Sequence, residues 1–395
     1  MTKEIVSEEV LKISSPHILL ELPTSYGKSK LALDRMEQCI DCNKNVKILV
    51  VVPRLALINN WKKEFKKWNR ETYLNSTVFS TYASLHHHTG KWDMVIFDEC
   101  HHLTERCRGL LQYFNISNSV LLSATVKKEL KEELTILFRG LYIYSISMRE
   151  AIDDEVLPDP KVYLMPLELP NNIPTEVIIK NPKGVGNITT SWATRWDYIR
   201  QKKYKVTIYC TQLQYYQDLC SQITYWKNSY MRTRKEAYKN KWLLLCGRRL
   251  SFLSDAKIPT VKMLLKKLSK ERTLTFCNSI QQTEMLGKHC VNSKNKERYV
   301  ILDKFNKQEI DHITACNMLN EGMNLVNCRV GIYNNLNSSE TIIKQRLGRL
   351  LRHKDPILII PYYKGTREEE IVEKMLEDYN PELVKTIVLF DQIKL

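Results

Sequence analysis

One stretch of the sequence combines residue types that bind phosphate. PTSYGKS (23–29) lies between an apolar run at 17–22 and a run with helical periodicity at 30–40. A Gly-Lys-Ser at the start of a helix offers backbone N–H groups to phosphate oxygens, while the lysine reaches the β- and γ-phosphates and the hydroxyl reaches Mg²⁺. The strict form of this loop has glycine at the position of Leu22, so the stretch alone also fits a turn before a surface helix. The residues expected around the phosphates are Pro23, Thr24, Ser25, Tyr26, Gly27, Lys28 and Ser29.

An acidic pair follows the loop about seventy residues later. Asp98 and Glu99 come directly after the apolar run DMVIF (93–97). Parallel sheets present the carboxyl ends of their strands to a ligand, so Asp98 can hold the Mg²⁺ that Lys28 and Ser29 help to position. Glu99 can orient or deprotonate the attacking water. The pair therefore favours nucleotide hydrolysis, with Ser29 and Asp98 as the metal ligands.

Short apolar runs alternate with helical patterns in both halves of the chain, as is typical of parallel sheets covered on both faces. A chain of 395 residues also exceeds what one hydrophobic core usually serves. We therefore predict an α/β protein with two tandem domains, 1–155 and 156–395, divided at the polar, proline-containing stretch 150–160. The expected strands lie at 17–22, 47–53, 93–97, 120–125 and 141–146, and then at 272–277, 299–302, 329–335 and 356–363.

A basic, aromatic-rich segment separates the two alternating patterns, at about 190–250. Residues 195–250 contain thirteen Lys and Arg against three Asp and Glu, with almost no Gly or Pro, and we expect two or three helices there. One interpretation is an amphipathic bundle with the aromatic rings inside and the cations in water. The other is a surface that follows a phosphate backbone, for which Arg232, Arg234 and Lys235 are the candidate contacts.

The charge balance points to a polyanionic partner. Lys and Arg number 60 against 44 Asp and Glu, a formal net charge of +16, which favours nucleic acid. The N-terminal stretch lacks the apolar core of a signal peptide, and the longest apolar runs fall short of the roughly 20 residues that span a bilayer. We therefore expect a cytoplasmic protein with no membrane partner.

Together these motifs resemble, in order, those of superfamily 2 helicases of the DEAD/DEAH type, with Asp98-Glu-Cys-His101 as a DECH variant of the acidic box. The resemblance implies two tandem RecA-like domains with ATP and Mg²⁺ between them, and an ATPase stimulated by nucleic acid. The matching segments are PTSYGKS, VVPRLALINNW (51–61), FSTYASL (79–85), Ser123-Ala124-Thr125, LTFCNSI (274–280), TACNMLNEGMNL (314–325) and QRLGRLLR (345–352).

Roles for individual residues follow from the same resemblance. Arg349 and Arg352 lie three apart, on one face of a helix, where arginines from a second domain can neutralise charge on the γ-phosphate, and Gln345 approaches the same phosphate. Ser123 and Thr125 would couple the acidic box to the bound strand. Gly322 and Asn324 would lie near the nucleotide, and the strand contacts would be Arg54, Thr81, Asn278 and Thr314.

Departures from the family pattern narrow the expected substrate. Ser25 replaces the usual glycine, and the form LPTSYGKS resembles phage recombination helicases of the branch-migrating type, which would act in the host cytoplasm. Asn324 stands where many relatives have Asp at a ribose contact. No glutamine precedes Pro23, so a DEAD-type RNA helicase is disfavoured. We expect a monomeric DNA helicase. The alternatives are a double-stranded DNA translocase that separates no strands, an RNA helicase, and a non-catalytic scaffold, which the intact site residues disfavour.

Overall fold

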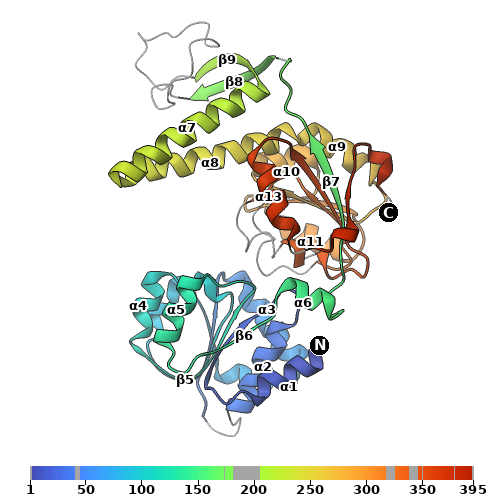
Figure 1. The fold of residues 1–395 in the computed structure, drawn as a ribbon. Helices are drawn as coiled ribbons and strands as arrows, with labels where there is room; N and C mark the ends of the chain where they lie inside the picture. Colours follow the sequence, from blue (N-terminus) through green and yellow to red (C-terminus); the bar gives the residue numbers. More distant parts are fainter. Residues whose placement is uncertain are drawn as a thin grey trace.

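Two sheets of parallel strands organise the chain (Figure 1). The computed structural model describes residues 2–40, 45–172, 174–180, 205–316, 325–337, 346–348, 350–377 and 379–393. Both sheets are covered by helices on their two faces, so the predicted α/β class with two parallel-sheet domains is confirmed. Figure 1 draws the first domain at the bottom and the second above it.

The first sheet has the strand order β3-β2-β4-β5-β1-β6. Its side chains alternate between two cores: Ile18 and Leu20 of β1 lie in one, and Leu19 lies in the other. Burial on both faces explains the unbroken apolar runs of the sequence. The strands are β1 (His17–Glu21), β2 (Ile48–Val52), β3 (Thr77–Thr81), β4 (Gly90–Phe97), β5 (Phe114–Ser123) and β6 (Tyr142–Ser145).

Helices cover both faces of this sheet. On one face α3 (Ala56–Lys67) buries Leu57, Trp61 and Phe65, which recur every four residues and so form one apolar stripe. The helices α1 (Lys3–Lys12) and α2 (Lys28–Cys39) share that core. On the opposite face lie α4 (Glu105–Leu111) and α5 (Lys128–Leu137), while α6 (Met148–Asp153) follows the last strand.

The second sheet has the strand order β11-β12-β10-β13-β14-β7-β15. Helices α11 (Arg298–Asn306) and α13 (Arg367–Leu376) pack on one face, and α9 (Ile258–Lys267) and α10 (Ile280–Leu286) pack on the other. The strands are β7 (Lys161–Leu167), β10 (Thr273–Cys277), β11 (Cys290–Val291), β12 (His312–Cys316), β13 (Val330–Tyr333), β14 (Ile357–Tyr363) and β15 (Val384–Thr386).

The strand predicted at 299–302 is wrong, because these residues belong to helix α11. The run YVIL is short and apolar, and such a run is compatible with a buried strand or with the inner face of a helix. The pattern continues to Phe305, which packs in the core with Ile301 and Leu302, so the helical spacing decides the structure.

A long helical hairpin leaves the second domain between β7 and β10 (Figure 1). It consists of α7 (Gln212–Thr233) and α8 (Glu236–Ala256), and we call it the arm. Before it lies an antiparallel pair of strands, β8 (Pro174–Lys180) and β9 (Lys205–Thr211). The expectation of helices throughout 195–250 is therefore wrong at 205–211, where the β-branched residues of KVTIYCT favour a strand.

Aromatic rings join the two helices of the arm. Trp226 meets Tyr238 with 5.4 Å between ring centroids, and Tyr230 stacks on Trp242 at 6.2 Å. These contacts agree with the bundle interpretation of the aromatic residues. The basic residues Arg232, Arg234 and Lys235, in contrast, are exposed at the tip.

A buried ion pair fixes the base of the arm to the second sheet. Lys257, between α8 and α9, donates from Nζ to Glu368 Oε1 at 2.6 Å and to the Pro361 carbonyl at 3.1 Å. Both charged side chains are fully buried. Burial lowers the pKa of Lys257 and raises that of Glu368, while their mutual attraction opposes both shifts.

Candidate nucleotide site between the two sheets

The loop 22–27 joins β1 to α2 in the form of a phosphate loop. Gly27 caps the helix with φ of 108°, a left-handed conformation that glycine adopts without strain. Lys28 donates from Nζ to the carbonyls of Leu22 (2.8 Å) and Pro23 (3.3 Å), so its ammonium lies over the loop. The Tyr26 ring is buried in the core beneath, so only its backbone is positioned to face a ligand.

Asp98 and Glu99 follow β4 at the same carboxyl edge of the sheet. The Asp98 N–H donates to the Val51 carbonyl, which extends the strand ladder by one residue, and Glu99 then turns with φ of 50°. Loss of hydration and the neighbouring Glu99 carboxylate raise the pKa of Asp98 to about 6, although the Trp61 hydrogen bond and the Lys28 charge act against the rise. Lys28 and Asp98 are therefore electrostatic neighbours.

The segment 346–352 of the second domain meets this loop directly. The Ser25 hydroxyl donates to the Gly348 carbonyl at 2.6 Å, and Arg352 Nε donates to Ser25 Oγ at 3.1 Å. A Cβ at position 348 would lie 1.4 Å from Thr24 Oγ1, so only glycine fits against the loop there. The structure thus joins residues from both sheets at one place.

Comparisons with known proteins agree with this two-part site. Residues 3–128 match the family model described as type III restriction enzyme, res subunit, and residues 256–354 match the helicase conserved C-terminal domain. The first range holds the phosphate loop and the acidic pair, and the second reaches Arg352. Together the two matches support a helicase of superfamily 2. They indicate a nucleic-acid-dependent ATPase.

Relatives of this helicase cover most of its length. It is 25% identical over 389 residues to the DNA 3'-5' translocase XPB2 of Sulfurisphaera tokodaii, covering 91% of this chain and 80% of that protein. The helicase domain of Pyrococcus furiosus Hef superposes with a TM-score of 0.53 at 14% identity, covering 94% of this chain and 97% of that one. Saccharomyces cerevisiae Dbp5 bound to RNA and ADP BeF3 gives 0.60 at 10% identity, covering 98% and 89%. The two structural similarities establish the fold.

Two side chains within the matching segments 51–61 and 79–85, neither of them predicted as a site residue, hold Asp98 in place. Trp61 Nε1 donates to Asp98 Oδ2 at 2.8 Å, and the Tyr82 hydroxyl donates to the Asp98 carbonyl oxygen at 2.7 Å. Trp61 is 3% exposed, and a buried indole N–H needs an acceptor. Trp61 continues the apolar stripe of α3, so the sequence predicts that its ring is buried. The need of a buried indole N–H for an acceptor is the signal that could have identified Trp61.

A polar chain connects the acidic box to the Ser-Ala-Thr segment. His101 Nδ1 lies 3.4 Å from Glu99 Oε2 and 3.1 Å from Ser123 Oγ, and Ser123 Oγ donates to the Thr125 carbonyl at 2.8 Å. The structure therefore connects Glu99 through His101 to Ser123, and through Ser123 to the backbone of Thr125.

Glu21, at the end of β1, is a further connection that the sequence motifs missed. Its carboxylate accepts from the Val126 N–H at 2.8 Å, from Lys131 Nζ at 2.6 Å and from Ser145 Oγ at 3.0 Å. It thereby joins the strand before the phosphate loop to the segment that follows Thr125. A polar residue at the end of an apolar strand was the only signal in the sequence.

The predicted strand contacts divide into exposed and buried positions. Arg54 is exposed and follows β2. Thr81 ends β3 at the carboxyl edge of the first sheet, but it is 8% exposed and its hydroxyl donates to Ser84 Oγ at 3.3 Å. Asn278 follows β10 in the second domain. Thr314 is also buried: it is 2% exposed and its hydroxyl donates to the Thr283 carbonyl at 3.0 Å. That hydroxyl is committed to the interior of the second domain.

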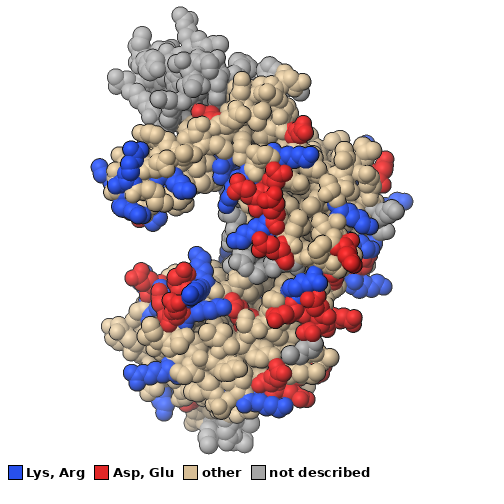
Figure 2. Space-filling model, in the orientation of Figure 1, with Lys and Arg blue, Asp and Glu red and all other residues tan. Residues whose placement is uncertain are grey.

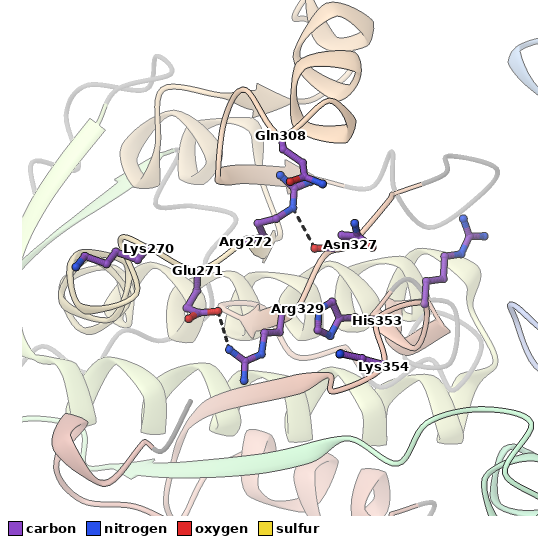
Figure 3. Close-up of a pocket in the computed structure, with 9 residues that line it drawn as sticks. Lys270, Glu271, Arg272, Gln308, Asn327, Arg329, His353 and Lys354 are labelled. Carbon is purple, nitrogen blue, oxygen red and sulfur yellow. Dashed lines mark hydrogen bonds and ion pairs between the residues drawn. The ribbon is translucent and has the colours of Figure 1, made fainter.

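Arg352 also lines a pocket of about 600 Å³ at the amino ends of strands in the second sheet (Figure 3). Within it Arg329 pairs with Glu271 at 3.1 Å, and Arg272 Nε donates to the Asn327 carbonyl at 3.0 Å, so internal partners hold both arginines. Arg352 instead donates to the loop of the first domain. The lining residues are Lys270, Glu271, Arg272, Gln308, Asn327, Arg329, Arg352, His353 and Lys354.

Four of the predicted site residues, Gly322, Asn324, Gln345 and Arg349, lie outside the described residues. Their neighbour Arg346 is 2% exposed, donates to the Asn335 carbonyl at 2.8 Å and packs over the adjacent rings of Phe276 and Tyr333. Arg346 thus anchors its segment in the second domain.

Within the described residues, no helix is both long and apolar enough to cross a bilayer. Over the same ranges, no three His, Cys, Asp or Glu side chains gather as a metal-binding group.

Proposed function

We propose that this helicase is an ATP-driven motor that moves along DNA. The observation that carries the proposal is the meeting of the phosphate loop with segment 346–352, because a site divided between two domains can convert hydrolysis into relative movement. The named activity of the relative XPB2, a DNA 3'-5' translocase, supports DNA as the track. Hydrolysis would open and close the site, and alternating grip by the two domains would move the strand.

The site residues take the following roles in this proposal. Lys28 and the backbone of 23–29 hold the phosphates, Glu99 orients the attacking water, and Arg352 neutralises charge on the γ-phosphate. Ser123 and Thr125 couple this chemistry to the strand. Arg349 and Gln345 would join Arg352 at the γ-phosphate, and Gly322 and Asn324 would lie near the nucleotide.

Ser29 and Asp98 would hold Mg²⁺. A hydroxyl and a carboxylate are the hard oxygen ligands that Mg²⁺ prefers, and the ion usually completes its shell with water and nucleotide phosphates. The raised pKa of Asp98 fits this role, because a cation is what a desolvated carboxylate beside Glu99 requires. When bound, Mg²⁺ would neutralise charge developing on the phosphates.

The proposed DNA path crosses both domains at the carboxyl ends of their strands. Arg54, Thr81 and Asn278 would contact phosphates and sugars, so binding would be largely independent of sequence. Thr314 would act through its backbone. The arm adds a second contact surface, since Figure 2 shows Lys and Arg at its tip facing the first domain across a hollow.

The domain bounds, the number of copies, the location and the preferred DNA structure are proposed from the sequence pattern. We assign residues 1–155 and 156–395 to the two domains, and we propose that one copy acts on its DNA in the cytoplasm without a membrane partner. The form LPTSYGKS, which resembles phage recombination helicases, suggests branched DNA as the substrate.

An ATPase assay with a panel of nucleic acids tests the proposal. Single-stranded, duplex, forked and four-way-junction DNA are compared with RNA, and we expect stimulation by DNA that is largest with the junction. Stimulation by RNA alone would refute the DNA proposal. Strand displacement and triplex displacement, measured on the same preparation, then distinguish unwinding from translocation on duplex DNA.

A further inference from the structure

The phosphate loop contains a serine where the backbone favours glycine. Ser25 has φ of 71°, in the left-handed region that residues with a Cβ rarely adopt. Two positions later Gly27 adopts a similar φ of 108°. Glycine at position 25 would remove this steric strain, so the side chain of Ser25 destabilises the loop conformation locally.

The Ser25 hydroxyl both donates a hydrogen bond to the second domain and accepts one from it. It donates to the carbonyl of Gly348 at 2.6 Å and accepts from Nε of Arg352 at 3.1 Å. Both partners lie more than 300 residues away in the sequence. The close fit of Gly348 against Thr24 keeps the two backbones near enough for these bonds.

We propose that Ser25 is a positioning residue, which holds Arg352 at the phosphate loop and favours closure of the two domains. This inference rests on the proposed function. A guanidinium has five N–H donors, and the contact with Ser25 uses the one on Nε, so this contact occupies none of the four Nη donors that would reach phosphate oxygens. Anchoring Nε also removes rotamer freedom that Arg352 would otherwise lose during hydrolysis.

Nucleotide binding by the first domain does not require this hydroxyl. Phosphate is expected to bind to the backbone N–H groups of the loop and to Lys28, which lies over the carbonyls of Leu22 and Pro23. Loss of the hydroxyl should therefore lower kcat and leave the affinity of the free enzyme for ADP unchanged.

The test compares Ser25→Ala with Ser25→Gly. Alanine removes the hydroxyl and keeps the strain, whereas glycine removes both. We expect kcat of nucleic-acid-stimulated hydrolysis to fall about 10-fold in each, the effect of losing a hydrogen bond to a charged group. The dissociation constant for fluorescent ADP, measured without nucleic acid, should stay within about twofold, which also shows that the variants fold.

A double-mutant cycle identifies Arg352 as the partner. The Arg352→Lys background lacks the Nε–H of the guanidinium. In that background, Ser25→Ala should lower kcat further by less than about twofold. Lys354→Ala is the matched control, because it removes a cation from the same pocket without touching Ser25, and it should leave the effect of Ser25→Ala unchanged.

Two results would overturn the inference. Wild-type kcat in Ser25→Gly would mean that the hydroxyl does not position Arg352. A parallel loss of ADP affinity would place Ser25 in nucleotide binding itself. Failure of the proposed function gives a different result, since the wild-type enzyme would then show no stimulation by DNA.

Discussion

At the scale of single residues, Asp98 combines catalytic potential with a cost in stability. Its pKa of about 6 lies above the ordinary value of 3.8. Between these two pH values the folded chain therefore holds a proton on Asp98 that the unfolded chain releases. As pH rises from about 4 to 6, the charged form becomes favoured in the unfolded state and the folded state loses stability relative to it. Above pH 6 the full cost is present.

Asp98→Asn should therefore stabilise the protein while abolishing hydrolysis. We expect an increase of about 1–3 kcal/mol in the free energy of unfolding at pH 7.5 without Mg²⁺, declining as pH falls from 6 towards 4. Thermal unfolding across this range measures the effect. Asp303→Asn, an exposed carboxylate on α11, is the control. An Asp98→Asn variant less stable than the wild type at pH 7.5 would contradict the assignment.

Trp61→Phe should weaken the support of Asp98 while preserving the apolar stripe of α3. The substitution deletes the indole N–H that donates to Oδ2, and the pKa of Asp98 should rise further. We expect kcat/KM for ATP to fall about 10-fold, with a larger loss at pH 6.5 than at pH 8.5.

A matched control for Trp61 lies in the same domain. Trp92→Phe deletes a buried indole N–H that donates to the His88 carbonyl at 2.7 Å, near the amino end of the strand that Asp98 follows. It should leave the pH profile of hydrolysis unchanged. Equal effects of the two substitutions would mean that Trp61 acts through general stability.

Single residues were predictable from the sequence to different degrees. Lys28 and Asp98 follow from motifs, because their chemistry fixes both residue type and spacing. Trp61 and Glu21 act through bonds to segments distant in sequence, which a motif does not reveal. Thr314 belongs to a matching motif, yet its hydroxyl is buried, because its strand lies within a sheet that is covered on both faces.

At the scale of elements, the arm is the structure most open to direct test. Its tip exposes Arg232, Arg234 and Lys235. Changing all three to Glu should weaken DNA binding about 10-fold or more at 0.1 M salt and flatten its salt dependence, because fewer counterions are released on binding. Fluorescence titrations at several salt concentrations measure this. Unchanged affinity would favour a solvated hairpin whose aromatic rings serve only its packing.

The base of the arm depends on the buried pair of Lys257 and Glu368. Lys257→Met should destabilise the protein by about 3–5 kcal/mol, because it leaves a buried carboxylate without its cation. The double variant Lys257→Met, Glu368→Leu should recover much of that loss. Lys267→Met, which removes an ion pair with the exposed Asp391, is the control and should change the melting temperature little.

The elements themselves were mostly predictable where periodicity is strong. The central strands β1, β2, β4 and β5 of the first sheet follow from apolar runs, since burial on both faces leaves little room for polar residues. The edge strand β3 (TVFST) has no such run and was not predicted. The run 299–302 was misassigned because four apolar residues fit a helix as well as a strand. The strand β9 preceding the arm was missed because the surrounding charges and aromatic residues suggested a helix.

At the scale of the whole molecule, the essential feature is a site that neither sheet completes alone. The order of motifs predicts that residues 23–29 and 345–352 share a ligand, and the structure brings Ser25 to Gly348 and Arg352. The bonds themselves were not predictable, since they depend on a left-handed serine and on a glycine that lets the backbones approach.

Hydrolysis of ATP by the wild type, Lys28→Ala and Arg352→Ala, each with and without DNA, tests this account most directly. The first substitution removes the proposed phosphate ligand of one domain, and the second removes the proposed γ-phosphate contact of the other. We predict that DNA stimulates the wild type and that each variant still binds DNA but loses the stimulated rate, by about 100-fold or more. Stimulated hydrolysis at the wild-type rate in either variant would contradict a site shared between the two domains.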